Sequence, residues 1–88
     1  MLEKEVEVKN RSGLHTRPAA SLVKISSRFK CDVYLVRDDF EINAKSIIGV
    51  MTLAAEQGSK LIFKTDGEDE QDALDSLVAL FDNGFGEL

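Results

Sequence analysis

The sequence has no tryptophan, and it has only one cysteine, one histidine and one proline. A lone Cys31 excludes an internal disulfide framework and is typical of a protein in the reducing cytoplasm. One histidine and one cysteine fall short of the usual zinc ligand sets, so we expect no metal site. No apolar run approaches the roughly 20 residues that span a membrane, and we expect neither membrane insertion nor a signal peptide.

Basic charge is also scarce, and it is unevenly distributed. The formal net charge is -5 over 88 residues. Residues 1–44 carry eight Lys/Arg against seven Asp/Glu, whereas residues 45–88 carry three against nine. This balance argues against a nucleic-acid partner, which selects a basic face with aromatic stacking platforms. The hydrophobic content of 43% suffices for one core, and the length predicts a single domain over residues 1–88.

Alternation of apolar and polar residues predicts four short strands, and helical spacing predicts three helices. The predicted strands span residues 2–8, 32–37, 40–43 and 60–65. The predicted helices cover residues 17–28, a short segment 47–53, and a stretch that starts after Asp69 and ends before Asn83. Four strands with helices available for one face indicate a two-layer α+β domain.

Individual positions in these elements carry specific expectations. In the second hairpin strand, Phe40 and Ile42 are expected to point inward. Asp69 is the candidate N-cap of the last helix, which has acidic residues in its first turn. We expect Glu87 and Leu88 to form a tail beyond that helix.

The segment from Gly13 to Ala20 combines the histidine and the proline. Gly13 permits a tight or positive-φ turn, and Pro18 suits the first turn of a helix. Thr16 or Arg17 is then expected as the N-cap, with His15 just before the helix. A helix N-terminus attracts anions, Arg17 has a guanidinium suited to phosphate, and a neutral imidazole is a nucleophile. The spacing is consistent with a phosphoryl-accepting histidine, although a surface or capping histidine has the same pattern.

Ser46 stands where an N-cap belongs, ahead of the short predicted helix. Its hydroxyl is expected to accept a backbone N–H bond worth about 1 kcal/mol. If Val50 and Leu53 point inward, then Ile47, Ile48 and Met51 remain at least partly outside. An exposed apolar patch of this kind favours contact with partner proteins, and packing under a loop is the alternative.

Two separated stretches resemble the histidine-containing phosphocarrier (HPr) family of the bacterial phosphoenolpyruvate-dependent sugar phosphotransferase system. The stretch Gly13–Ala20 resembles the family's active-site signature, and Lys45–Met51 resembles its regulatory-serine segment. The resemblance implies an open-faced β-sandwich, in which an antiparallel four-stranded sheet is covered by three helices on one face, in the order βαββαβα.

The resemblance also implies a mechanism. Enzyme I would phosphorylate His15 on Nδ1 with a phosphoryl group from phosphoenolpyruvate, and His15 would pass it to the EIIA domain of a sugar permease. Arg17 and the backbone N–H groups of Thr16 and Arg17 would stabilise the transferring group. Such a protein is a carrier and not a free-standing enzyme, requires no cofactor, and is expected to be monomeric.

The family's regulatory and docking positions are matched as well. Ser46 matches the serine that the HPr kinase/phosphorylase modifies in many bacteria, a modification through which a CcpA-type regulator binds in carbon catabolite regulation. Position 48, often Met or Phe in the family, is Ile here, which bears more on a CcpA-type contact than on phosphotransfer. The residues that match the docking face are Thr16, Ala20, Lys24, Ile47, Ile48, Met51 and Thr52.

Three alternatives remain open at this point. One is a regulatory or nitrogen-branch paralogue that signals instead of feeding sugar uptake; the catabolite-repression relatives usually lack the histidine, which His15 disfavours. A second is a small α+β enzyme such as an acylphosphatase, although the glycine-rich loop of that family is absent. The third is an anion-binding regulatory domain in which Arg17 binds the ligand and His15 is incidental.

Overall fold

A computed structural model of the protein describes residues 1–86. The sheet consists of β1 (Leu2–Glu7), β2 (Asp32–Arg37), β3 (Phe40–Asn43) and β4 (Lys60–Asp66). The helices are α1 (Thr16–Ser26), α2 (Ile47–Thr52) and α3 (Glu70–Asp82), followed by a 3-10 turn over Gly84–Gly86. The predicted element order is therefore confirmed, and the predicted tail at 87–88 lies outside the described residues.

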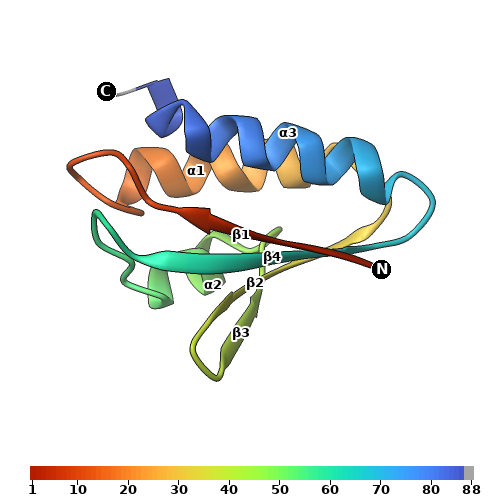
Figure 1. The fold of residues 1–88 in the computed structure, drawn as a ribbon, viewed down its shortest axis with the longest axis horizontal. Coiled ribbons are helices and arrows are strands. Elements are labelled where there is room, and N and C mark those ends of the chain that lie inside the picture. Colours follow the sequence, from red (N-terminus) through yellow and green to blue (C-terminus); the bar gives the residue numbers. More distant parts are fainter. Residues whose placement is uncertain (87–88) are drawn as a thin grey trace.

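The strands form one antiparallel sheet in the order β1–β4–β2–β3 (Figure 1). Helices α1 and α3 run side by side across one face, and α2 packs against α1 and β3 (Figure 1). Within residues 1–86, the other face of the sheet has no helix over it (Figure 1). The two layers predicted from the sequence pattern are confirmed, and so is the open-faced sheet that the family resemblance implied.

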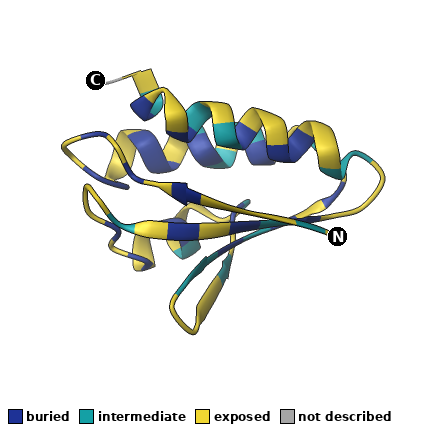
Figure 2. Cartoon of the chain, viewed as in Figure 1, coloured by how far each residue is buried: buried dark blue, intermediate teal, exposed yellow. Residues whose placement is uncertain are grey.

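The core lies between the sheet and the helices α1 and α3 (Figure 2). The alternation of β2 and β4 points Leu35 and Phe63 into this layer, where both are fully buried. Phe63 contacts Phe81 of α3 in a T-shaped arrangement, with ring centroids 5.1 Å apart. The predicted apolar stripe of α3 is confirmed by the burial of Ala73, Leu74, Leu77 and Phe81, with Val78 half-buried at its border.

The prediction for Phe40 is wrong, because this side chain is 55% exposed. It lies at the start of the edge strand β3 and pairs with Arg37 at the very end of the ladder. Within the described residues 1–86, no helix lies over the free end of the β2–β3 hairpin (Figure 1). Ile42, two residues further along, is half-buried.

Asp69 precedes α3 as predicted, but its side chain does not cap that helix. Its carboxylate accepts hydrogen bonds from the backbone N–H groups of Lys30 and Cys31, both at 2.9 Å. The bond from Lys30 is the main reason why the pKa of Asp69 lies below its ordinary value. Burial and the contact with Asp69 raise the pKa of the Cys31 thiol to about 11, so this cysteine stays a protonated, buried apolar residue.

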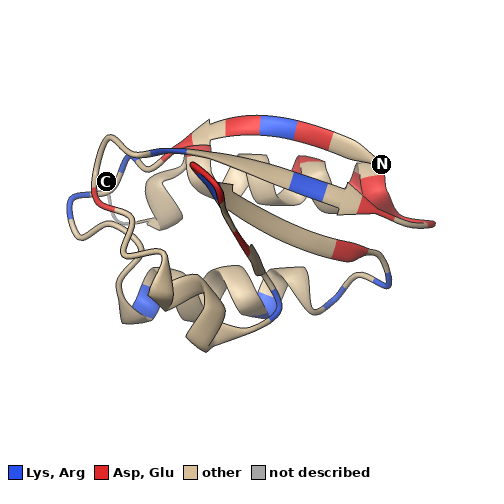
Figure 3. Cartoon of the chain, turned by 90° about the horizontal axis from the view of Figure 1, so that it is seen from below, with Lys and Arg blue, Asp and Glu red and all other residues tan. Residues whose placement is uncertain are grey.

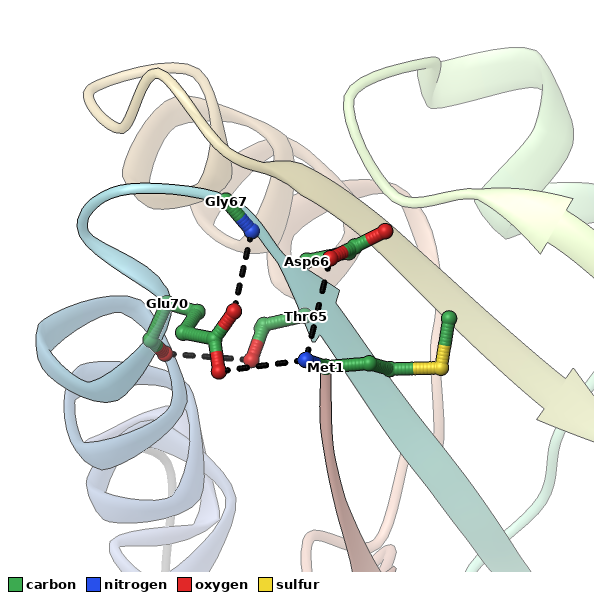
Figure 4. A network of polar contacts seen from close by, with 5 residues as sticks. All are labelled: Met1, Thr65, Asp66, Gly67 and Glu70. Carbon is green, nitrogen blue, oxygen red and sulfur yellow. Dashed lines mark hydrogen bonds and ion pairs between the residues drawn. The ribbon is translucent and has the colours of Figure 1, made fainter.

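A polar network joins the start of α3 to the edge of the sheet (Figure 4). The amino group of Met1 pairs with the carboxylates of Asp66 and Glu70. Glu70 also accepts the backbone N–H of Gly67 at 3.0 Å, which is the main cause of its lowered pKa. In the first turn of α3, the carboxylate of Glu70 is therefore bound by a neighbouring amide and an ammonium group.

Candidate functional site

The candidate site lies at the N-terminus of α1. His15 is the N-cap residue, with an extended backbone (φ -80°, ψ -173°), and its carbonyl accepts the N–H of Ala19 at 2.8 Å. The prediction that Thr16 or Arg17 would be the N-cap is therefore wrong by one or two residues. Thr16 and Arg17 are already helical and Pro18 occupies the third helical position, because the chain leaves the preceding turn directly at His15.

The N-terminus of α1 is open to an anion. The His15 side chain makes no capping hydrogen bond, and the first turn contains no acidic residue. The N–H groups of Thr16 and Arg17 have no acceptor inside the helix, and Pro18 has no N–H. His15, Thr16 and Arg17 are all exposed. The positive end of the helix, one guanidinium and one imidazole are thus concentrated at a solvent-accessible point.

A buried asparagine shapes the loop that leads to His15. Asn10 is fully buried, and its Nδ2 donates to the Gly13 carbonyl at 2.8 Å and to Ser12 Oγ at 3.1 Å. Gly13 has φ +67°, and a Cβ at this position would overlap the carbonyl oxygen of Ala55. The next residue, Leu14, is buried and donates its N–H to that same Ala55 oxygen at 2.9 Å. The positive-φ turn that Gly13 was expected to permit is confirmed, and the loop that leads to His15 is attached to Ala55.

An open hollow of about 460 Å³ adjoins His15. Arg11, Ser12 and Leu14 form one wall with His15, and the end of α2 with the segment after it forms the other. The lining residues of this second wall are Met51, Ala54, Ala55 and Glu56. The hollow therefore lies between two segments that are some 40 residues apart in the sequence.

The predicted docking residues are gathered on α1 and α2. Thr16, Ala20 and Lys24 follow one another along α1 at four-residue spacing, and all are exposed. On α2, the exposed fractions are 39% for Ile47, 74% for Ile48 and 41% for Met51, and Thr52 is also exposed. Because α2 packs against α1 and Met51 shares the hollow with His15, these residues form a surface next to the histidine.

This surface differs in charge from the rest of the molecule. Neither α1 nor α2 contains an Asp or a Glu, whereas acidic residues line β1 and the turn before α3 (Figure 3). Arg17 and Lys24 are the only charged residues of the two helices. An apolar surface with a basic margin is suited to a partner with an apolar, acidic face.

Ser46 caps α2 as predicted: its Oγ accepts the N–H of Gly49 at 3.2 Å, and the side chain is exposed. Val50 and Leu53 are buried beneath the helix, also as predicted. The hydroxyl therefore lies beside the exposed apolar residues of α2 and is accessible to solvent.

Arg37 was not anticipated from the sequence. Its Nη1 donates to the carbonyl oxygens of Leu53 at 2.9 Å and Ala54 at 3.1 Å, and Ala54 lines the hollow. The alternation of β2 could have indicated that Arg37 points toward the interior, because it continues the inward row of Val33 and Leu35. Ala54 has φ +50°, and an alanine gives no sequence signal for this conformation.

Within residues 1–86, no cluster of three or more His, Cys, Asp or Glu residues is arranged to hold a metal ion. Over the same residues, no helix has the length and hydropathy to cross a bilayer. The N-terminus of α1 offers the imidazole of His15, the guanidinium of Arg17 and free backbone amides, and Arg11, Ser12 and Glu56 line the adjoining hollow.

Comparison with known proteins gives a consistent result. A family model described as "PTS HPr component phosphorylation site" matches residues 2–83. The chain is 49% identical over 87 residues to phosphocarrier protein HPr of Treponema pallidum, covering 99% of both chains. It is 46% identical over 79 residues to the HPr-like protein Crh of Bacillus subtilis, covering 90% of this chain and 93% of Crh.

Solved structures agree with the fold. The crystal structure of HPr-C-His from Thermoanaerobacter tengcongensis superposes with a TM-score of 0.97 at 41% identity, covering 100% of this chain and 99% of the other. A crystal structure of an HPr dimer from the same organism gives a TM-score of 0.80 at 41% identity, with 99% and 100% coverage.

Proposed function

The chain belongs to the HPr family of phosphocarriers of the phosphotransferase system, and on that premise we propose that His15 is its phosphoryl-accepting residue. The donor is enzyme I, charged from phosphoenolpyruvate, and the acceptor is the EIIA component of a sugar permease. The observation that carries the proposal is the position of His15 as the N-cap of α1, a helix whose first turn contains Arg17 and no acidic residue.

The chemistry follows from this position. A ring nitrogen of His15 attacks the phosphorus, and the phosphorus–nitrogen bond forms as the bond to the donor breaks. Arg17 and the first N–H groups of α1 stabilise the charge on the phosphoryl oxygens during transfer. The reverse step at EIIA uses imidazole as the leaving group. The protein acts as a carrier whose partners complete each active site, and it needs no cofactor or metal.

We further propose that both partners dock on the surface formed by α1 and α2. Its exposed members are Thr16, Ala20, Lys24, Ile47, Ile48, Met51 and Thr52. Phosphorylation of Ser46 by an HPr kinase/phosphorylase would place about two negative charges on this surface and oppose docking of enzyme I. The same modification would suit recognition by a CcpA-type regulator. In this role residues 1–88 act as one cytoplasmic domain and as a monomer.

The test is the mass of the intact protein, measured at alkaline pH after incubation with phosphoenolpyruvate and enzyme I. We expect one added phosphate, lost in acid and absent from His15→Ala. The variant should keep its unfolding temperature because His15 is exposed. Equal phosphate uptake by His15→Ala would refute the assignment.

A regulatory paralogue is the second candidate function, favoured by the 46% identity to Crh. A signalling protein of this kind would be modified at Ser46 and would not pass phosphate to EIIA. Transfer from phosphorylated His15 to an EIIA domain therefore separates the two functions: a carrier is discharged within the assay, whereas a regulatory paralogue retains the phosphate or never acquires it.

A further inference from the structure

The left-handed residue after α2 borders the proposed phosphoryl site. Ala54 has φ +50°, a conformation that costs a non-glycine residue about 1 kcal/mol or more. Ala54 lines the hollow next to His15, and so does the following residue, Ala55. A strained residue persists only where its surroundings hold it in place.

Arg37 is the side chain that holds this turn. It reaches from the end of β2 and donates through Nη1 to the carbonyl oxygens of Leu53 (2.9 Å) and Ala54 (3.1 Å). Helix α2 has no basic residue in its own last turn, so Arg37 also supplies the cation that favours a helix C-terminus. Two hydrogen bonds from one guanidinium nitrogen thus define the orientation of consecutive peptide groups.

The turn is connected to His15 by one hydrogen bond. The carbonyl of Ala55 accepts the N–H of Leu14 at 2.9 Å, and Leu14 immediately precedes His15. On the same side, Gly13 lies so close to Ala55 that no side chain fits between them. A change in the direction of the 54–55 peptide would therefore move the loop from which the imidazole projects.

We propose that Arg37 is a positioning residue for the phosphoryl-accepting site. By holding the carbonyls of Leu53 and Ala54, it keeps Ala54 left-handed, so that Ala55 anchors Leu14 and orients His15. This inference rests on the proposed function of His15 and assigns part of the preorganisation of His15 to Arg37, at the end of β2.

The experiment compares Arg37→Met with Arg37→Met/Ala54→Gly. Methionine keeps much of the side-chain length but has no donor. Glycine adopts positive φ without strain, so it should restore the turn in the absence of the two hydrogen bonds from Arg37. Arg28→Met is the matched control for loss of one positive charge, since Arg28 follows the other end of α1, about 20 Å from His15 along the helix axis.

Two readouts are needed. Amide hydrogen exchange at Leu14, followed by NMR, reports the anchor without any phosphoryl chemistry. Steady-state phosphorylation by enzyme I reports the site. For Arg37→Met we expect Leu14 exchange to accelerate and kcat to fall by about tenfold each, since small misplacements of a reacting group are costly. KM should stay within about twofold, because Arg37 is outside the proposed docking surface.

The double variant decides between positioning and charge. Recovery of both Leu14 exchange and kcat to within about threefold of wild type supports the positioning role of Arg37, because it shows that the two substitutions are coupled. Unchanged Leu14 exchange in Arg37→Met overturns it. Failure of Ala54→Gly to restore kcat overturns it as well, because the loss would then come from the missing charge or from general destabilisation.

The experiment distinguishes failure of the proposed function of His15 from failure of the positioning role of Arg37. If wild-type protein takes up no phosphate, the role of His15 is refuted, and with it the role of Arg37 in that reaction. The exchange at Leu14 still shows whether Arg37 holds the loop. If wild type is phosphorylated and Arg37→Met is equally fast, only the positioning inference is lost.

Discussion

The N-termini of α1 and α3 differ in whether acidic side chains lie next to the free backbone N–H groups of the first turn. Each helix presents unpaired N–H groups and the positive end of its dipole. The first turn of α3 contains Glu70 and Asp72, and Glu70 is bound by the Met1 ammonium and the Gly67 amide. The first turn of α1 contains no acidic residue. Its N-cap, His15, makes no side-chain hydrogen bond to the helix.

The difference shows that a helix N-terminus remains available to an external anion when its first turn contains no acidic residue. At α3, protein carboxylates supply the negative charge, and the contacts there are structural. At α1, the first turn contains no acidic residue, includes Arg17, and is exposed next to an apolar surface. Four variants, in decreasing order of expected effect on phosphoryl transfer, test how far this contrast holds.

Arg17→Met should have the largest effect. Removing a preorganised charge from a transferring phosphoryl group typically costs about 10²–10³ in rate. The fold should be unaffected because Arg17 is exposed. The initial rate of phosphorylation by enzyme I is the measurement, with Arg28→Met as the charge-matched control. Equal rates for the two variants would remove Arg17 from the site.

Thr16→Glu would make α1 resemble α3. A carboxylate in the first turn should stabilise the helix slightly but repel the phosphoryl group, slowing uptake by about tenfold. Gln71→Glu adds the same charge to the first turn of α3 and should leave the rate unchanged. If both variants slow uptake alike, overall charge and not the local field controls the reaction.

Ser46→Asp should slow phosphorylation by enzyme I severalfold, through a raised KM, because it places a charge on the proposed docking surface. Aspartate is also a good N-cap, so α2 should remain folded. Ser46→Asn keeps the cap without the charge and should behave as wild type. An unchanged KM in Ser46→Asp would show that enzyme I does not dock over α2.

Asp69→Asn should lower stability and leave phosphoryl transfer intact. The carboxylate has a pKa below its ordinary 3.8 because it accepts the Lys30 and Cys31 amides. Its contribution to stability is therefore present above pH 3.8 and is lost as the pH falls through the lowered value in the folded protein.

Thermal unfolding measured from neutral to acid pH checks this prediction. Wild type should lose stability toward acid more steeply than Asp69→Asn, and the two curves should converge at the lowest pH. Parallel curves would show that the carboxylate charge adds nothing to these two hydrogen bonds. A reduced rate of phosphorylation in Asp69→Asn would instead show that the N-terminal region of α3 contributes to phosphoryl transfer and is not purely structural.

Much of the fold and of the candidate site could be predicted from local pattern. The bounds of β2 and β3, the apolar stripe of α3, the Ser46 cap and the exposure of Ile48 each depend on residues only a few positions apart. His15 and Arg17 belong to one continuous segment, so their proximity is a consequence of the chain itself.

Other features were decided only by tertiary structure. His15 and not Thr16 became the N-cap, because the preceding loop is fastened to Ala55. Asp69 turned from its own helix to the amides of residues 30–31, and Phe40 lies at a corner that no helix covers.

The sequence by itself thus determined the helices, the strands and the segment that carries the reactive groups, because hydrogen bonds within a helix and alternation within a strand are local. Tertiary structure decided the partners of Asp69, the exposure of Phe40 and the contact between Arg37 and Ala54. Those depend on which distant segments meet, and a side chain's donors and acceptors do not specify that in advance.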